Sequence, residues 1–399
     1  MSAVLFAALG AFLVLTRRPD DVWALFFVLA AAQLFVHTNS TLSALLHARQ
    51  QVAGMSALAV GTKVLWAGGV LVAIVLGLGL WAFGLAYLVS EAVESVFLLV
   101  LAKRHLGLVV RVDRAATTAM LVASLPYYLN VFATAAYGKL DVTWLALVST
   151  QRDVGWYAAS SAVAGLTLLA TPLIAWVLMP VFAKAAARSR EELFARLSGA
   201  TEIILAVAIP ASLFVILSAD LVVHVLFGAA FAPAVLGLQV LAGTFVVTYV
   251  AIVYAITLMM LGRPWVLTGI SVAGLVVNMG LNVALVRPAL GWFGPGGGGA
   301  GCGLAMLGTE LFVTTTMISF VGRGAVNRRT LVAGAKMLVA CAAVVVVHVL
   351  LARLGWYRLG VDLLVYVVVV TASGALRTRE LGELVSQALR ASRGREGAR

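Results

Sequence analysis

Residues 84–91 read Gly-Leu-Ala-Tyr-Leu-Val-Ser-Glu, and residues 303–310 read Gly-Leu-Ala-Met-Leu-Gly-Thr-Glu. Gly, Leu, Ala, Leu and Glu recur at a constant offset of 219 residues (303 minus 84), and Arg104 and Arg323 recur at the same offset. Both stretches open a long apolar segment and place Glu at the same depth in it. We interpret them as an internal repeat, which indicates a chain of two related halves. A chance match is the alternative, because Gly, Leu and Ala are common in this chain.

The composition places these halves in a membrane. Of 399 residues, 63% are hydrophobic and 11% are charged, and the mean hydropathy is +1.07. Ordinary globular domains carry about 25% charged residues, so the composition excludes a water-soluble enzyme. A net charge of +12 would suggest nucleic acid in a soluble protein. Here it is typical of loops that obey membrane topology, and we expect no nucleic-acid partner.

Twelve apolar runs approach the length of about 20 residues that a helix needs to cross a bilayer. They predict an all-α polytopic membrane protein with about twelve transmembrane helices. The predicted spans are residues 2–16, 22–46, 53–78, 81–102, 118–148, 154–183, 197–218, 238–262, 264–286, 300–322, 330–352 and 357–376.

Lys and Arg divide unevenly between alternate loops, with 19 in one set of loops and 6 in the other. Basic residues concentrate on the cytoplasmic side, so we assign the richer set, and both termini, to the cytoplasm. A signal peptide has positive charges ahead of its apolar core, whereas Arg17 and Arg18 follow the first apolar run. We therefore interpret residues 2–16 as a span.

The repeat predicts the domain organisation. Six helices separate its equivalent elements, so the first half lacks two helices at its start. We expect an incomplete four-helix N-terminal lobe over residues 1–117, a six-helix C-terminal lobe over 118–324, two additional helices over 325–376 and a basic cytoplasmic tail over 377–399. The chain is then a shortened member of a 14-helix design, through a misplaced start codon or a deletion.

Several motifs in the middle of the chain occur in a characteristic order. They are Ser124-Leu-Pro-Tyr-Tyr, Lys139-Leu-Asp141, Val154-Gly-Trp-Tyr-Ala-Ala, Leu178-Met-Pro180, Leu226-Phe-Gly, and Asn278 and Asn282 followed by Gly291. Their order and spacing resemble the polysaccharide-biosynthesis flippases, the Wzx-type lipid-linked oligosaccharide flippases of the MATE-like superfamily. The resemblance covers roughly residues 30–350, and members of this family usually begin with two further helices.

The resemblance implies a V-shaped pair of six-helix lobes around a cavity that opens alternately to each side. It implies a flippase that moves undecaprenyl-linked oligosaccharides across the bacterial inner membrane for surface polysaccharide, such as O-antigen, capsule or exopolysaccharide. The implied partners are the lipid-linked substrate, membrane lipid, a polysaccharide polymerase and glycosyltransferases, with no cofactor. The alternatives are a cation-coupled multidrug antiporter of the same superfamily and a flippase for lipid-linked peptidoglycan precursors.

Carboxylates inside spans are the first candidate site residues, because each ionisable group there costs about 2.5–3.5 kcal/mol and tends to mark a transport pathway. Glu91 and Glu310 each lie about 15 Å from the outer interface at 1.5 Å per residue, and Glu94 follows Glu91 by three residues. They bind a proton or sugar hydroxyls in the functional interpretation. In the structural interpretation, each is a protonated glutamate that forms a hydrogen bond with a Ser, Thr or Asn on the next helix.

Lys139, Asp141 and Lys63 are further candidates. Lys139 and Asp141 are two residues apart and cannot face each other on a helix, so each needs its own partner. Both could lie at the interface and extend toward water. Alternatively, Lys139 and Lys63 supply positive charge that attracts a lipid pyrophosphate or an acidic sugar.

Two prolines and two tyrosines complete the candidates. Pro126 and Pro172 fall within spans and are predicted hinges, with a kink of no functional consequence as the alternative. Tyr127 and Tyr128 either stack on sugars or pack.

The sequence shows no enzyme or metal signature. The five histidines have no metal-binding spacing, and no Cys–His or Ser–His–Asp set can be assembled. Cys302 and Cys341 lie in apolar runs and are interpreted as packing residues. The glycine cluster at 294–303 lacks the Gly-Lys-Ser/Thr of a phosphate loop and is interpreted as a flexible turn.

Overall fold

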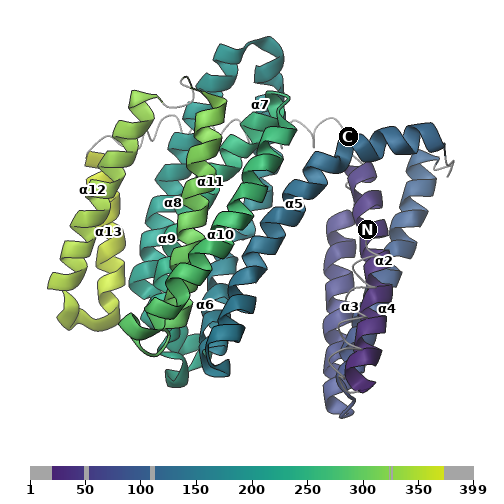
Figure 1. The fold of residues 1–399 in the computed structure, drawn as a ribbon, viewed down its shortest axis with the longest axis horizontal. Helices are drawn as coiled ribbons and strands as arrows, with labels where there is room; N and C mark the ends of the chain where they lie inside the picture. Colours follow the sequence, from purple (N-terminus) through teal and green to yellow (C-terminus); the bar gives the residue numbers. More distant parts are fainter. Residues whose placement is uncertain (1–19, 49–53, 108–112, 323, 325–326, 373–399) are drawn as a thin grey trace. The chain divides into compact units, whose positions relative to one another are not determined.

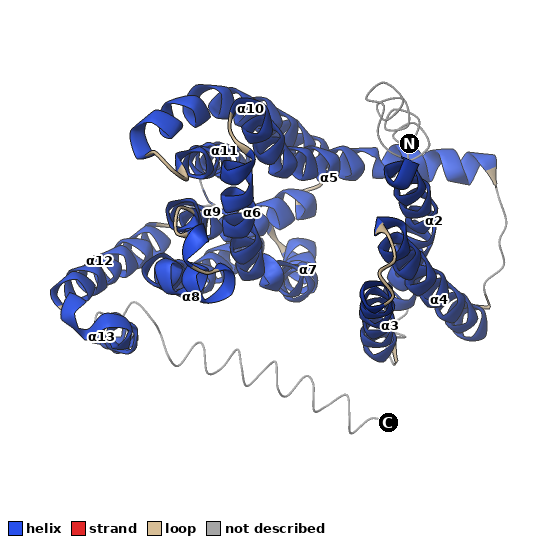
Figure 2. Cartoon of the chain, turned by 90° about the horizontal axis from the view of Figure 1, so that it is seen from below, coloured by secondary structure: helices blue, strands red, loops and turns tan. Residues whose placement is uncertain are grey.

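A computed structural model describes residues 20–48, 54–107, 113–322, 324 and 327–372. These residues are helical or form short connections, with no strand among them (Figures 1 and 2). Ten segments in this part of the chain are long and apolar enough to cross a membrane. The all-α polytopic fold class is therefore confirmed, whereas the predicted span 2–16 and the tail 377–399 lie outside the described residues.

The helices follow the apolar runs. Their bounds are α2 Asp20–Ala48, α3 Met55–Val75, α4 Leu80–Leu106, α5 Arg114–Val148, α6 Gln151–Thr167, α7 Thr171–Arg188, α8 Arg190–Phe227, α9 Ala234–Met260, α10 Pro264–Phe293, α11 Gly297–Val321, α12 Arg328–Leu350 and α13 Arg358–Ala372. The segment predicted as one span at 154–183 consists of α6 and α7, joined by the 3₁₀ turn Leu168–Ala170. The last predicted span corresponds to α13, which has 15 described residues.

The chain divides into two compact units, residues 1–117 (unit 1) and 118–399 (unit 2). In unit 1, α4 packs against both α2 and α3. In unit 2, α11 packs in the same way against α9 and α10. Because α4 and α11 carry the two repeated stretches, the matched helices share their packing as well as their sequence. The separation of residues 325–376 from the C-terminal lobe stays a prediction, since α12 packs against α8 within unit 2.

The first glycine of each repeat lies where two helices approach closely. A Cβ on Gly84 of α4 would lie 2.8 Å from Leu25 Cδ1 of α2, and one on Gly303 of α11 would lie 3.0 Å from Val240 Cγ1 of α9. Small residues let helix backbones approach each other in membranes. The repeated glycine therefore has the same packing role in both units.

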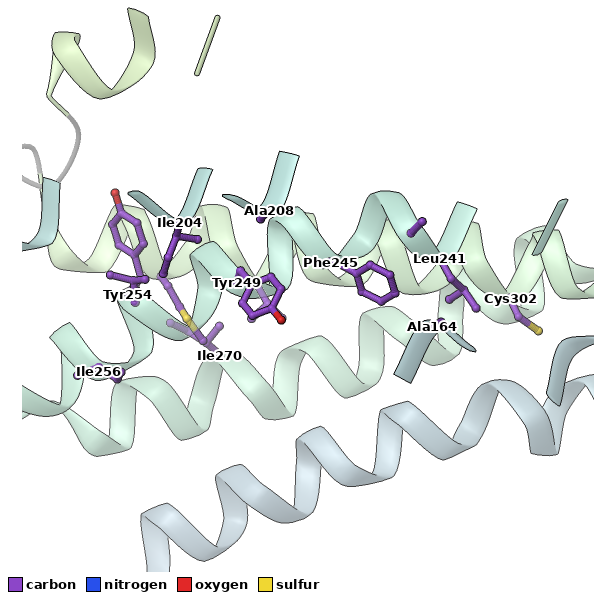
Figure 3. Close-up of a cluster of buried hydrophobic side chains, with 14 of the residues drawn as sticks. Ala164, Ile204, Ala208, Leu241, Phe245, Tyr249, Tyr254, Ile256, Ile270 and Cys302 are labelled. Carbon is purple, nitrogen blue, oxygen red and sulfur yellow. The ribbon is translucent and has the colours of Figure 1, made fainter. Parts of the chain in front are cut away.

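The main core of unit 2 lies among α5 to α11. Figure 3 shows part of it, with Tyr249 of α9 near Ile270 of α10 and with Phe245 further along α9, towards Leu241. A smaller cluster joins α8 to α12 and α13, and His348 Nδ1 of α12 lies 2.6 Å from Asp362 Oδ2 of α13. Many large apolar side chains on the outer faces of both units are exposed, as expected of helices that contact lipid.

The glycine cluster departs from its expected role. α11 already begins at Gly297, and the glycines from there to Gly303 are buried. A Cβ on Gly297 would lie 2.3 Å from Ala289 O, and one on Gly301 would lie 2.8 Å from Val286 Cα. The prediction of a flexible turn is wrong for this part of the cluster, because these glycines allow α11 to pack tightly against α10. Only Gly294 and Gly296 form a turn, with φ of 67° and 83°.

Of the two predicted hinge prolines, Pro172 lies at an interruption of regular helix, whereas α5 continues through Pro126. Pro126 is inside α5, and its carbonyl accepts a hydrogen bond from Thr268 Oγ1 of α10 at 2.6 Å. Pro172 lies in the first turn of α7, directly after the 3₁₀ turn. There the Thr167 carbonyl accepts a hydrogen bond from the Tyr249 hydroxyl. The hinge roles stay predictions.

Candidate functional site

Unit 1 holds a polar cluster around Glu91, which is 5% exposed. Asn39 of α2 donates from Nδ2 to Glu91 Oε2 at 3.1 Å and to the Glu91 carbonyl at 3.0 Å. The Ser95 hydroxyl, one turn along α4, donates to Asn39 Oδ1 at 2.5 Å. These bonds fix the Glu91 side chain between α2 and α4.

The second oxygen of Glu91 faces α3. Lys63 Nζ lies 3.5 Å from Glu91 Oε1, although the Lys63 side chain is 59% exposed. The same nitrogen lies 5.9 Å from the centre of the Tyr87 ring. Glu94 has a separate partner, because its Oε2 accepts a hydrogen bond from Thr62 Oγ1 at 3.1 Å. The structure thus brings Glu91, Glu94 and Lys63 together on facing sides of α3 and α4.

Unit 2 holds a longer polar network around Asp141 of α5. Asn282 of α10 donates from Nδ2 to Asp141 Oδ1 at 2.7 Å, and the Tyr157 hydroxyl of α6 donates to Oδ2 at 3.2 Å. Asn282 Nδ2 also contacts Asn278 Oδ1 at 3.1 Å, and Asn278 Nδ2 donates to Thr309 Oγ1 of α11 at 3.3 Å. All five residues are buried, so the network fixes α5, α6, α10 and α11 to one another.

Glu310 adjoins this network on α11. It is 3% exposed, and its Oε1 accepts a hydrogen bond from the Tyr137 hydroxyl of α5 at 2.9 Å. Tyr137 is one turn before Asp141 on α5, and Glu310 follows Thr309 directly on α11. In the described part of unit 2, neither Asp141 nor Glu310 forms an ion pair with a basic side chain. Both carboxyl groups are accommodated by neutral hydrogen-bond donors.

The remaining candidates lie apart from these clusters. Lys139 is exposed although Asp141, two residues later, is 2% exposed. The Asp141 side chain therefore does not extend into water, whereas that of Lys139 can, and the positions of both relative to the membrane interface stay predictions. Tyr127 and Tyr128 are exposed on α5, at 45% and 37%.

Sequence reasoning missed most hydrogen-bond partners in both clusters. Asn278 and Asn282 were singled out only through the family resemblance, and Tyr157 only as part of a motif. Asn39, Ser95 and Tyr137 were not identified. A polar residue within an apolar span was the available signal for Asn39. Among the described residues, no group of three or more His, Cys, Asp or Glu side chains is placed to hold a metal ion.

Comparison with known proteins decides the family. The family model described as "Polysaccharide biosynthesis protein" matches residues 2–236. The chain belongs to the polysaccharide biosynthesis protein family. A curated relative of the chain is the "Probable low-salt glycan biosynthesis flippase Agl15" of Haloferax volcanii, 24% identical over 151 residues. That match covers 38% of this chain and 32% of the relative, so it spans about a third of the relative's length.

Solved structures show that the chain has the MATE-like fold. A mutant of the Vibrio cholerae MATE transporter VcmN aligns with a TM-score of 0.59 and 14% identity, covering 80% of this chain and 75% of VcmN. The lipid II flippase MurJ, in an inward closed conformation, aligns with a TM-score of 0.64 and 10% identity, covering 90% of this chain and 74% of MurJ. The predicted family and the predicted MATE-like fold are both confirmed, and the chain is a multi-pass membrane protein.

Proposed function

We propose that the protein flips undecaprenyl-linked oligosaccharide units from the cytoplasmic to the outer leaflet of the bacterial inner membrane, for surface-polysaccharide assembly. The observation that carries this proposal is the family match over residues 2–236. It is supported by the relative named as a glycan biosynthesis flippase. A polysaccharide polymerase and glycosyltransferases would then act on either side of the transport step.

The polar residues inside the spans are proposed to serve the hydrophilic glycan, while the lipid tail stays in the bilayer. The proposed pathway residues are Glu91, Glu94, Lys63, Lys139, Asp141, Glu310, Tyr127 and Tyr128. Flipping makes and breaks no covalent bond, so the proposed role needs no catalytic residue. The energy would come from a transmembrane ion gradient or from consumption of the product outside. In the first case, a carboxyl group that takes up a proton would couple the gradient to transport.

Two observations favour other substrates. Buried carboxyl groups without a basic partner, on the fold of a MATE transporter, favour a cation-coupled multidrug antiporter. The similarity to a lipid II flippase favours a peptidoglycan-precursor flippase. Both alternatives use the same fold, so substrate assays must separate them.

The deciding experiment is complementation. The chain is expressed in bacteria that lack their own O-unit flippase, and surface polysaccharide is stained. The test variant is Glu91→Gln, and its matched control is Lys184→Gln, at an exposed lysine of α7 outside the polar clusters. We expect glycan display from the wild type and Lys184→Gln, and loss with Glu91→Gln. Rescue of a lipid II flippase mutant, or drug efflux in place of glycan display, would contradict the proposal.

The proposed orientation follows from the loop charges and has its own test. Ala232, before α9, is expected outside the cell, and Ser189, between α7 and α8, inside. In a variant without native cysteines, an impermeant thiol reagent added to whole cells should label Ala232→Cys and not Ser189→Cys. Labelling of Ser189→Cys alone would reverse the assigned topology.

A further inference from the structure

Four side chains form a continuous row on the facing sides of α3 and α4. Lys63 and Trp66 are three residues apart on α3, and Tyr87 and Glu91 are four apart on α4, so each pair lies on one helix face. The Trp66 and Tyr87 rings meet edge to face, with centroids 6.2 Å apart at 73°. Lys63 Nζ lies over Tyr87 and beside Glu91. The row therefore runs from an aromatic pair through an ammonium group to a carboxylate.

This row is accessible at a depth where lipid would be an unfavourable neighbour. Lys63 is 59% exposed and Trp66 40%. Lys63 lies eight residues after the start of α3, which is about 12 Å along the helix at 1.5 Å per residue. A charged group inside a membrane span almost always faces the interior of the bundle or a water-filled pathway. The exposed side of Lys63 is therefore best explained as facing a solute.

We propose that Lys63, Trp66 and Tyr87 form a subsite for a sugar that carries an anionic group, either at a glycosyl phosphate or at an acidic residue of the glycan. The subsite rests on the proposed flippase function and specifies what its substrate offers to unit 1. The exposed Trp66 ring stacks on the apolar C–H face of the sugar, the Tyr87 ring holds Trp66 edge to face, and the Lys63 ammonium donates to the anion.

The geometry around Lys63 is suited to reversible ligand binding. Strong ammonium–carboxylate hydrogen bonds are about 2.7–2.9 Å long, whereas Lys63 Nζ lies 3.5 Å from Glu91 Oε1. The ammonium group has three donors, so it can bind an incoming anion while Glu91 compensates its charge. When the site is empty, Glu91 and the Tyr87 ring stabilise the cation.

Asn39 and Ser95 are positioning residues for this subsite. The Ser95 hydroxyl donates a hydrogen bond to Asn39 Oδ1, and this bond orients Asn39 Nδ2 toward Glu91 Oε2. Glu91 therefore keeps its place between α2 and α4 when Lys63 turns to a ligand. Neither residue is exposed enough to contact the sugar itself, because both are buried.

The test is direct binding, measured without transport. The full chain is purified into phosphatidylcholine nanodiscs, which lack anionic headgroups. Saturation-transfer NMR then measures the affinities of glucose 1-phosphate, glucuronate and neutral methyl glucoside. The variants are Lys63→Gln and Trp66→Leu, and Lys63→Arg tests whether a retained charge rescues binding. The matched controls in unit 2 are Lys184→Gln and Trp265→Leu, the latter at a tryptophan that is 56% exposed.

We expect the anionic sugars to bind the wild type and both controls. Lys63→Gln and Trp66→Leu should each lower that affinity about tenfold, the scale of one charge-assisted hydrogen bond or one aromatic stacking contact. Preference for glucose 1-phosphate over glucuronate would assign the anion to the glycosyl phosphate, and the reverse to an acidic sugar. Methyl glucoside binding as tightly as the anions, or unchanged affinity in Trp66→Leu, would overturn the subsite.

The same variants separate this proposal from the flippase function. If the wild type binds anionic sugars with the expected variant pattern but does not restore surface glycan, the subsite stands and the flippase proposal fails. If the wild type restores surface glycan but Lys63→Gln and Trp66→Leu bind the probes unchanged, the flippase proposal stands and the subsite fails.

Discussion

In α4 and α11 the same repeated stretch ends on a glutamate, Glu91 in unit 1 and Glu310 in unit 2, and the two side chains have different neighbours. Glu91 lies 3.5 Å from the ammonium group of Lys63, a side chain that is 59% exposed. Glu310 accepts a hydrogen bond from the buried Tyr137 hydroxyl and lies next to a buried amide and hydroxyl network. A repeated residue thus faces an accessible cation in one unit and a sealed polar core in the other.

The difference shows that a shared position does not imply a shared role. An ion pair with one exposed partner can exchange that partner for a ligand at small cost, since surface-type pairs contribute little. A carboxyl group sealed among neutral donors can change state only if those donors rearrange, because an unpaired buried charge is costly. We infer that unit 1 contacts solute through its glutamate cluster, whereas the cluster of unit 2 responds through the packing of its helices.

The largest expected effect is on transport by Glu91→Gln and Glu310→Gln. Each change keeps the side-chain size and removes one charged acceptor, and a hydrogen bond to a charged group contributes roughly 1.5–3 kcal/mol. Surface-glycan display should therefore fall about tenfold or more in each variant. Display is compared at equal membrane abundance, measured by immunoblot. Normal display in both variants would exclude the mid-membrane carboxylates from transport.

A double variant makes this comparison sharper. In Glu91→Gln the pair with Lys63 is already broken, so adding Lys63→Gln should lower surface-glycan display by less than the same change does in the wild type. Combined with Glu310→Gln, Lys63→Gln should lower display by its full wild-type factor, because Lys63 belongs to unit 1. Equal behaviour of the two combinations would mean that the glutamates are not distinguished by Lys63.

An intermediate effect is expected on thermal stability. Asp141→Ala removes the acceptor of both Asn282 and Tyr157, and unsatisfied buried donors cost about 1–3 kcal/mol. Asn39→Ala in unit 1 removes a donor to Glu91, which keeps Lys63 as a partner. The melting temperature in detergent, followed by fluorescence-detected size exclusion, should therefore fall further for Asp141→Ala. A larger loss for Asn39→Ala would mean that unit 1 holds the more tightly coupled network.

The sequence predicted the helices and the carboxylates, and for simple reasons. Apolar runs of about 20 residues identify spans without knowledge of packing, and Glu91, Asp141 and Glu310 stand out because charges within such runs are rare. Their partners could not be predicted, because a helix that is apolar on all sides gives no periodic signal for the face it buries. Tyr137 is therefore indistinguishable from a lipid-facing tyrosine until the fold brings its hydroxyl to Glu310 of α11.

The glycine cluster at 294–303 shows the same limit of prediction from sequence. The lack of a Cβ in glycine serves either a turn with positive φ or a close helix contact, and sequence alone did not distinguish the two in this cluster. Gly296 is in a turn, whereas Gly301 lies against the α10 backbone. The repeat was the stronger signal, since Gly84 and Gly303 both face a neighbouring helix.

The smallest expected effect compares those two repeated glycines. A Cβ at position 84 would meet the end of the flexible Leu25 side chain, whereas one at position 303 would lie 3.0–3.1 Å from both Cγ1 and Cβ of Val240, a β-branched residue that cannot turn away. Overpacking costs about 1–3 kcal/mol where neighbours cannot relax, so Gly303→Ala should lower the melting temperature more than Gly84→Ala. Shortening the opposing side chain in Gly303→Ala/Val240→Ala should recover part of the loss. No recovery would mean that Gly303 acts through the α11 backbone rather than through its approach to α9.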